Sequence, residues 1–178
     1  MRLHSLLAAC LLLSACHSVR LSDDRAQNFD FQRYTAEQDL VAVVFLAPDC
    51  PICQKQVLTL NRLAERFPQV RFAGVFTKWD SWADVARFQQ KYHPQFPLWR
   101  DGRMRLVKHL DASITPQVFL LKRGAVVYRG AVDNWFVSLG RYRPEPTEHY
   151  VQDAIEQILA GSQVGRPITE AVGCWIER

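Results

Sequence analysis

The chain has 178 residues, of which 48% are hydrophobic and 22% are charged, a composition typical of one globular domain with a core of useful size. Its formal net charge is +4, from 22 basic and 18 acidic residues that are mixed along the sequence. No block of basic residues is present that would follow a phosphate backbone, so nucleic acid is excluded as an expected partner.

The first fifteen residues have the layout of a signal peptide. Arg2 supplies a positive start, residues 6–13 are almost continuously apolar, and small residues follow. This segment is too short to span a bilayer comfortably. We therefore expect an exported protein from which residues 1–15 are removed.

The end of this segment, Leu13-Ser14-Ala15-Cys16, resembles the bacterial lipobox, in which cleavage precedes a cysteine that then carries lipid. The resemblance implies an envelope protein that is anchored through Cys16 and faces the periplasm, and an ordinary cleaved signal with Cys16 left free is the alternative. His17 is not the aspartate associated with inner-membrane retention, which weakly favours the outer membrane. The polar residues 16–30 predict a membrane tether.

The remaining cysteines indicate redox chemistry. Cys10 would be removed with the signal peptide and Cys16 would carry lipid, which leaves Cys50, Cys53 and Cys174 in a compartment where disulfides can persist. An odd number of thiols indicates either that the protein exchanges disulfides or that one thiol is free and reactive.

The first clear element of the domain is a strand that leads into a helix. Residues 40–47 are apolar and rich in β-branched side chains, which predicts a strand buried on both faces of a sheet. Val57, Leu60 and Phe67 then follow at helical spacing, so a helix is expected to begin at the cysteine pair and to end near Phe67. Cys50 is thereby placed at a strand-to-helix junction.

Further strands and helices alternate along the rest of the chain, which favours parallel strands joined by helical crossovers. The expected elements are a strand at 70–77, a helix opened by a capping box of Ser81 and Asp84, a short helix at 104–110, strands at 117–122 and 125–129 joined by a hairpin at Arg123-Gly124, and a last helix over 151–159 with Thr147 as N-cap and Gly161 as C-cap.

Residues 132–146 are long for a connection without structure of its own. They contain Asp133, Asn134 and Trp135, and we interpret the segment as a recognition loop with Trp135 as a candidate substrate contact.

The cysteine pair has the spacing of a thiol-exchange site. A thiol exchanges with a disulfide only as the thiolate, and a helix N-terminus lowers the pKa of a cysteine through its unpaired amide groups and positive dipole end. Cys50 is therefore the expected nucleophile. Cys53 lies about one helical turn later and is the expected resolving thiol, which would release a mixed disulfide.

Together these features resemble the thioredoxin-like fold over residues 31–161: Cys50-Pro51-Ile52-Cys53 after an apolar strand, Thr115-Pro116 before a later strand, and the β-α-β-α-β-β-α order. More narrowly, Thr115-Pro116-Gln117-Val118, Val127-Tyr128-Arg129-Gly130 and Gly173-Cys174-Trp175-Ile176 resemble the redoxin branch near the alkyl hydroperoxide reductase and thiol-specific antioxidant group. The resemblance implies an α/β fold with a central mixed sheet flanked by helices, followed by a C-terminal extension over 162–178 that carries Cys174.

The resemblance also implies roles for single residues. Pro116 would be cis and would shape a groove beside the cysteine pair, where the backbone at Thr115 binds an extended partner segment. A disulfide between Cys174 and the active site is implied as well, which would make Cys174 a third redox thiol. The alternative is an incidental cysteine in an extension that Trp175 and Ile176 pack against the domain.

Several positions depart from these families. Asp49 and Val44 stand where thioredoxins have a tryptophan and a buried acid, so proton handling is left open, and Asp49 would oppose thiolate formation if it faced Cys50. Val43 and Ala47 occupy the proline and threonine positions of the peroxiredoxin pattern Pro-x-x-x-Thr-x-x-Cys. A thiol peroxidase is therefore the weaker enzyme alternative.

Copper binding is the alternative that is not an enzyme. Copper-delivery proteins on this fold use two cysteines with three residues between them and a downstream histidine. This chain has two residues between its cysteines, and His93, His109 and His149 form no second metal motif.

The expected function is thus an exported, lipid-anchored thiol-disulfide oxidoreductase. It would exchange disulfides with exported proteins and take electrons from, or pass them to, another thiol protein, with no organic cofactor and no metal. The sequence leaves open whether it reduces, oxidises or isomerises its partners.

Overall fold

The computed structural model describes residues 18–23, 25 and 27–177. The expected signal peptide and the expected lipidation of Cys16 lie outside these residues. Within the described part, no helix has the length and apolar character needed to cross a membrane.

From the first central strand onward, the predicted strands and helices are present in the predicted order, and further strands lie between them. The helices are α1 (Phe31–Ala36), α2 (Pro51–Arg66), α3 (Trp82–Tyr92), α4 (Arg105–Leu110) and α5 (Tyr150–Leu159). The strands are β1 (Arg20–Asp23), β2 (Asn28–Asp30), β3 (Val41–Phe45), β4 (Arg71–Thr77), β5 (Leu98–Asp101), β6 (Ile114–Thr115), β7 (Gln117–Lys122), β8 (Ala125–Gly130), β9 (Phe136–Ser138), β10 (Arg141–Tyr142) and β11 (Cys174–Trp175).

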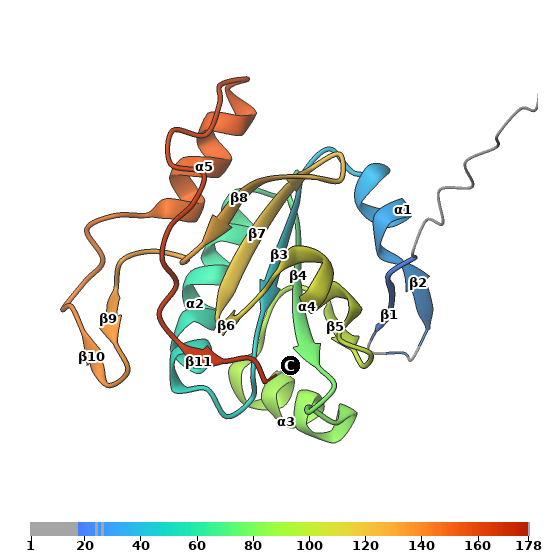
Figure 1. Cartoon of the computed structure of the whole chain (residues 1–178). Coiled ribbons are helices and arrows are strands. Elements are labelled where there is room, and N and C mark those ends of the chain that lie inside the picture. The colour runs from blue at the N-terminus through green and yellow to red at the C-terminus, as the bar shows by residue number, and fades with distance from the viewer. Residues whose placement is uncertain (1–17, 24, 26, 178) are drawn as a thin grey trace, which may run out of the picture.

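Seven strands form one mixed sheet in the order β2-β1-β5-β4-β3-β7-β8 (Figure 1). β4 pairs in parallel with both β3 and β5, whereas β7 pairs antiparallel with β3 and β8. The parallel pairs are joined through α2 and α3, since a tight turn cannot connect parallel strands. The predicted central mixed sheet with flanking helices is confirmed.

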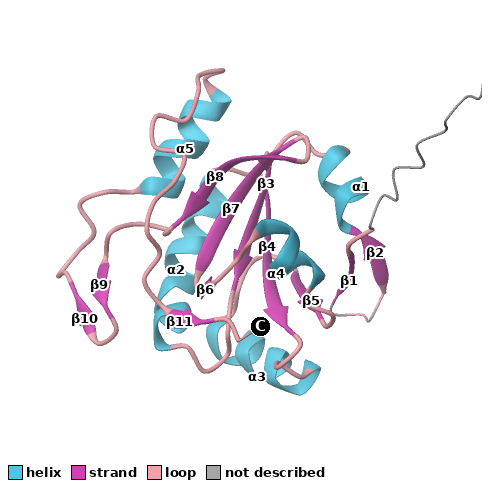
Figure 2. Cartoon of the chain, viewed as in Figure 1, coloured by secondary structure: helices cyan, strands magenta, loops and turns pink. Residues whose placement is uncertain are grey.

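Helices cover both faces of the sheet (Figure 2). The alternation of side chains along β3 explains this, because each face of the strand is apolar. Ala42 and Val44 belong to a core shared with α2, α3 and α5, whereas Val41, Val43 and Phe45 belong to a core shared with α1 and α4. The strand that leads to Cys50 is therefore held from both sides.

Local sequence signals set the ends of several elements as predicted. Ser81 and Asp84 form the capping box at the start of α3. Arg123 and Gly124 have positive φ angles of 49° and 84°, the conformation that a two-residue hairpin turn of type I′ requires. Pro51 occupies the first turn of α2, where its missing N–H group costs nothing.

The later part of the expected tether, from residue 20 onward, instead contributes strands to the fold. Residues 20–23 and 28–30 form β1 and β2, and β1 pairs with β5 at one edge of the sheet. Val19 and Leu21 are buried in the same core as α1 and α4, so this short segment has enough apolar surface to be fixed there. The prediction of a tether over 16–30 is wrong for these strand residues.

The region before the last helix also differs from expectation. The N-cap of α5 is His149 rather than Thr147, and Ala160 is its C-cap, with Gly161 following at a φ of 75°. The segment 132–146 is not a loop without structure, because β9 and β10 form an antiparallel hairpin within it.

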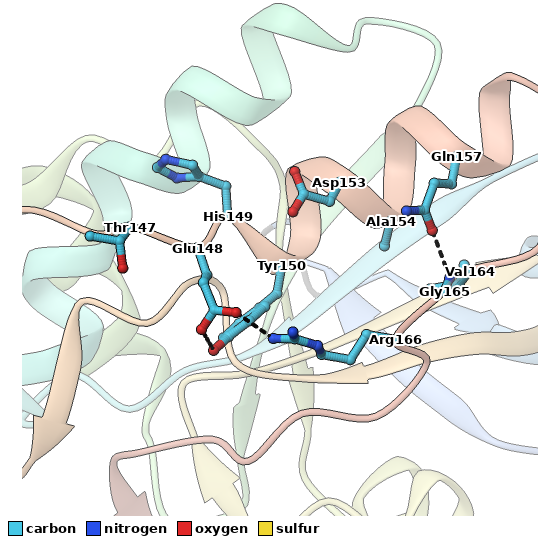
Figure 3. Close-up of a pocket in the computed structure, with 10 residues that line it drawn as sticks. All are labelled: Thr147, Glu148, His149, Tyr150, Asp153, Ala154, Gln157, Val164, Gly165 and Arg166. Atoms are coloured by element: carbon cyan, nitrogen blue, oxygen red, sulfur yellow. Dashed lines mark hydrogen bonds and ion pairs between the residues drawn. The ribbon is translucent and has the colours of Figure 1, made fainter.

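The C-terminal extension returns along α5 and then along the edge strand β8 to the end of β6 (Figure 1). Beside α5, Gly165 N donates to Gln157 Oε1 at 2.7 Å and Arg166 pairs with Glu148 at 2.7 Å (Figure 3). These residues border a cavity of about 480 Å³ at the start of α5. The extension is thus attached to α5 and β8 before it reaches the cysteine pair.

Candidate active site

Cys50 occupies the junction between β3 and α2, as predicted. It is the N-cap residue of α2, with an extended backbone (φ −77°, ψ 113°), and only 1% of its surface is exposed. As a thiol, its Sγ donates to the carbonyl oxygen of Thr115 at 3.2 Å. Ionisation would end that contact and leave the sulfur facing hydrogen-bond donors from two other cysteines.

Cys53 lies one turn further along α2 and is completely buried. Burial is the main cause that raises its pKa well above the ordinary value, and the hydrogen bond that it donates to Cys50 and the charge of that thiolate add to the effect. Cys53 is therefore protonated at neutral pH. It acts as a donor to Cys50 until Cys50 becomes part of a disulfide.

The pKa of Cys50 is lowered to about 5. The hydrogen bond from the Cys53 thiol is the largest cause, and it outweighs the burial that acts in the opposite direction. A hydrogen bond from Cys174 and the backbone amide groups of Cys53 and Cys174 lower the pKa further. At neutral pH the buried Cys50 sulfur is a thiolate.

Cys174 is brought to this thiolate by strand pairing. β11 pairs antiparallel with β6, which places Cys174 opposite Thr115. Its Sγ lies 2.9 Å from Cys50 Sγ and is oriented to donate a hydrogen bond to it. Burial, this hydrogen bond and the Cys50 charge raise the pKa of Cys174 to about 12, with a smaller contribution from the charge of Asp49.

Thr115 and Pro116 lie where the resemblance placed them. The Thr115-Pro116 peptide bond is cis, and both residues are buried. The Thr115 carbonyl faces Cys50, and its Oγ1 donates to the carbonyl of Cys174 at 3.4 Å. Thr115 of β6 therefore contacts both Cys50 and Cys174.

Access from solvent differs among the three cysteines of the described residues, all of which are free thiols. Cys50 and Cys53 are buried and Cys174 is partly exposed. A cavity of about 500 Å³ opens beside Cys174 and is bordered by Asp49, Trp79 and Trp175. A molecule in this cavity meets Cys174 first, because β11 lies over Cys50.

A buried polar pair near the cysteines was missed from the sequence. Gln56 Nε2 donates to Asp133 Oδ1 at 2.9 Å, and both side chains are buried. Gln56 Oε1 and Asp133 Oδ2 have no hydrogen-bond partner among the residues that the structure describes, and burial raises the pKa of Asp133. Gln56 stands three residues after Cys53 on the apolar face of α2, and a polar residue at such a position was the signal to look for.

Other expected residues lie apart from the thiols. Trp135 packs in the β9–β10 hairpin, where its Nε1 donates to the carbonyl of Arg143 and its ring contacts Tyr142. It borders a separate cavity of about 390 Å³. Asp49 is exposed, and it is not among the main influences on Cys50.

The three histidines considered for copper are exposed at element ends: His93 at the C-cap of α3, His109 on α4 and His149 at the N-cap of α5. Among the residues that the structure describes, no three His, Cys, Asp or Glu side chains are grouped so that they could hold a metal ion.

A mixed sheet with helices on both faces, a Cys-x-x-Cys pair at the start of α2 and a cis-proline beside it define a thioredoxin-like protein. Within that class, residues 14–129 match the model of the AhpC/TSA family, and the chain belongs to this family. No curated protein matches the chain.

Solved structures agree with the fold. An uncharacterized conserved protein from Geobacillus kaustophilus superposes with a TM-score of 0.75 at 20% identity, covering 90% of this chain and 88% of that chain. A secreted Mycobacterium tuberculosis disulfide oxidoreductase homologous to E. coli DsbE has a TM-score of 0.55 at 17% identity, covering 80% and 94%. A thioredoxin-like protein from Aeropyrum pernix has a TM-score of 0.54 at 17% identity, covering 63% and 80%. Family and fold together support a thiol-redox role.

Proposed function

We propose that the chain is an exported, lipid-anchored thiol-disulfide oxidoreductase that exchanges disulfides with protein partners through Cys50 and Cys53. The observation that carries the proposal is the placement of Cys50 as the N-cap residue of α2, with Cys53 one turn further along the same helix and the cis peptide bond of Thr115-Pro116 beside it. These surroundings lower the pKa of Cys50 to about 5. A thiolate is the reacting form in disulfide exchange, and a neighbouring thiol can complete the exchange.

The exchange is a pair of displacements. The Cys50 thiolate attacks one sulfur of a partner disulfide, forms a mixed disulfide and releases the other partner sulfur as a thiolate. Cys53 then loses its proton and attacks Cys50 Sγ, which releases the second partner sulfur and leaves a Cys50–Cys53 disulfide. Two electrons pass to the partner, and the reverse sequence oxidises a partner dithiol.

In this proposal, Cys174 can replace Cys53 as the partner of Cys50 in the disulfide. Once deprotonated, it can attack Cys50 Sγ of the Cys50–Cys53 disulfide, which forms a Cys50–Cys174 disulfide and frees Cys53 as a thiolate. The separation of 2.9 Å between the two sulfurs supports this step. No external oxidant is consumed, because the exchange only moves the disulfide.

Trapping of the mixed disulfide tests the proposal. The purified protein with both Cys53→Ser and Cys174→Ser should accumulate a mixed disulfide between Cys50 and a protein disulfide substrate such as insulin, because both thiols that lie close enough to carry out the second displacement are removed. Wild-type protein with excess dithiothreitol should reduce the same substrate catalytically, and Cys50→Ser should be inactive in both assays. A Cys50→Ser variant that keeps the activity would overturn the proposal.

Membership in the AhpC/TSA family favours a thiol peroxidase as the second candidate. In that case the Cys50 thiolate would attack a peroxide oxygen, and Cys53 or Cys174 would resolve the sulfenic acid as a disulfide with release of water. Hydrogen peroxide consumption by the reduced protein measures this activity. Rapid peroxide turnover with slow reduction of protein disulfides would favour the peroxidase.

A further inference from the structure

We propose that β11 is an intramolecular occupant of the partner groove, and that a partner reaches Cys50 by replacing it with an extended segment of the same chemistry. That segment would carry a glycine directly before its cysteine and an apolar residue two positions after it. The inference rests on the proposed exchange at Cys50 and adds the kind of partner and the competitor that it must displace.

The backbone of β11 lies on β6 as a strand. Cys174 pairs with Thr115 and Trp175 pairs with Ile114, in antiparallel register. The amide of Ile176 donates to the carbonyl of Ser113 at 2.9 Å, which continues the same ladder by one step. Main-chain pairing of this kind accepts any extended segment, and the side chains decide which one fits.

The sulfur of β11 is placed as the sulfur of a bound partner would be. Cys174 Sγ is 2.9 Å from Cys50 Sγ, whereas a disulfide bond is about 2.05 Å long. A displacement of about 1 Å would join the two atoms. Cys50 is only 1% exposed with β11 in place, so a large partner cannot reach it without movement of this strand.

Two side-chain positions on β11 define the expected sequence. A Cβ atom on Gly173 would lie 2.0 Å from the carbonyl oxygen of Thr115, so the residue before the cysteine must be glycine for the backbone to approach this closely. Ile176 is buried in the core shared with α1 and α4. Trp175 between them is 77% exposed, so the position directly after the cysteine is tolerant.

Few contacts hold the strand in place. β11 has two residues, and beyond them on the C-terminal side lie the Ile176–Ser113 hydrogen bond, the buried Ile176 side chain and a hydrogen bond from Trp79 Nε1 to the carbonyl of Glu177 at 3.0 Å. Upstream, Thr169 is fixed on β8 through its backbone and its Oγ1. The residues from 170 onward can therefore leave β6 while the rest of the extension stays attached.

A peptide of residues 171–177, Ala-Val-Gly-Cys-Trp-Ile-Glu, is the direct probe. Its cysteine is joined to thionitrobenzoate, so attack by Cys50 on the peptide sulfur releases a coloured thiolate and leaves a mixed disulfide. The protein carries Cys53→Ser and Cys174→Ser, which makes Cys50 the remaining active-site thiol. Exchange of the peptide's glycine for alanine should slow the reaction about tenfold, and exchange of its tryptophan for alanine should have little effect.

Displacement of β11 is tested in the same background. Gly173→Ala should speed the reaction with the peptide several-fold, because the added methyl group drives β11 from β6. Gly165→Ala is the matched control in the same extension, since its Cβ would meet nothing closer than 3.7 Å. Trp79→Phe removes the hydrogen bond to Glu177 from an exposed site and should also speed the reaction, which guards against a folding defect in Gly173→Ala.

The outcomes separate the inference from the proposed function. Equal rates for the native peptide and the peptide with alanine in place of glycine would overturn the inference, as would no gain in rate from either Gly173→Ala or Trp79→Phe. Rapid reaction of Cys50 with a small aromatic disulfide would in that case leave the exchange proposal standing. Failure with both the small disulfide and the peptide would overturn both.

Discussion

At the scale of the residue, the site depends on how protons are shared among three adjacent sulfurs. Cys53 and Cys174 keep their protons because their pKa values are raised, and both donate to Cys50, whose pKa falls to about 5. The two donors stabilise a charge that burial alone would disfavour. The start of α2 positions the nucleophile Cys50, and hydrogen bonds from the other two thiols lower its pKa.

The ionisation of Cys50 gives the first prediction. In the fully reduced protein, the ultraviolet absorbance of a thiolate should appear with a midpoint near pH 5 as pH rises. Cys53→Ala should move this midpoint upward, because the largest stabilising hydrogen bond is removed. A midpoint that stays near pH 5 in Cys53→Ala would contradict the assigned cause, and Cys50→Ser identifies the signal.

Asp133 gives a second prediction, on stability. Its pKa in the folded state is raised by burial, so its protonated form favours folding, and this contribution is complete below the unfolded pKa of about 3.9 and is lost as pH rises through the folded value. Asp133→Asn keeps an oxygen that accepts from Trp135 N and Gln56 Nε2 and carries no charge. The difference in unfolding free energy between Asp133→Asn and wild type should therefore grow in favour of the variant from pH 4 to pH 7.

Asp133→Ala is the matched comparison for this side chain. It leaves the buried donors of Trp135 and Gln56 without an acceptor, which should cost about 1–3 kcal/mol. Urea unfolding at both pH values measures all three proteins. A wild type that is more stable than Asp133→Asn at pH 7 would show that the carboxylate is required there.

At the scale of the element, a close backbone approach attaches the extension to the domain. Gly130 ends β8 with a φ of 149°, and a Cβ atom there would lie 2.1 Å from Thr169 Oγ1. Thr169 Oγ1 accepts from Ala131 N at 3.0 Å and lies 2.6 Å from the buried hydroxyl of Tyr128. This contact fixes the extension between α5 and β11.

A third prediction follows for this contact. Gly130→Ala should lower the free energy of unfolding by about 1–3 kcal/mol and expose the extension to limited proteolysis, because neither the φ angle nor the space admits a side chain. Gly165→Ala should change neither property by much. Equal protease resistance of the two variants would show that the extension is held elsewhere.

Elements with a local signal could be predicted from the sequence, and elements that depend on distant partners could not. The apolar run of β3 and the capping box of α3 are visible within a few residues. β1 was missed because its partner β5 lies about 75 residues away along the chain and only Val19 and Leu21 mark its burial.

The candidate site divides in the same way. The spacing of Cys50 and Cys53 and the Thr115-Pro116 pair indicated their place in the site from the sequence. The family resemblance implied that Cys174 belongs to the site, but its position against Cys50 depends on the pairing of β11 with β6, across almost 60 residues, which residue spacing alone does not predict. Trp135 was expected to contact substrate, but its surroundings in the hairpin are those of a packed aromatic residue.

At the scale of the whole molecule, the cysteine proposed to carry lipid precedes the described domain by only a few residues in the sequence. The sheet begins at Arg20, four residues after the cysteine proposed to carry lipid. The fourth prediction is that Cys16→Ser moves the protein from the membrane fraction to the soluble fraction of a bacterial host and removes incorporation of labelled fatty acid. Disulfide exchange by the variant should be unchanged, and persistent lipid labelling would contradict the proposed anchor.

The most direct test of the central claim is the equilibrium of the purified protein in glutathione buffers of graded potential, with disulfides mapped by mass spectrometry. We expect a reversible two-electron couple between Cys50 and Cys53 that persists in Cys174→Ser, and a Cys50–Cys174 disulfide in Cys53→Ser. Thiols that remain reduced across the range from about −300 to −120 mV, or a Cys50 that oxidises only irreversibly, would contradict it.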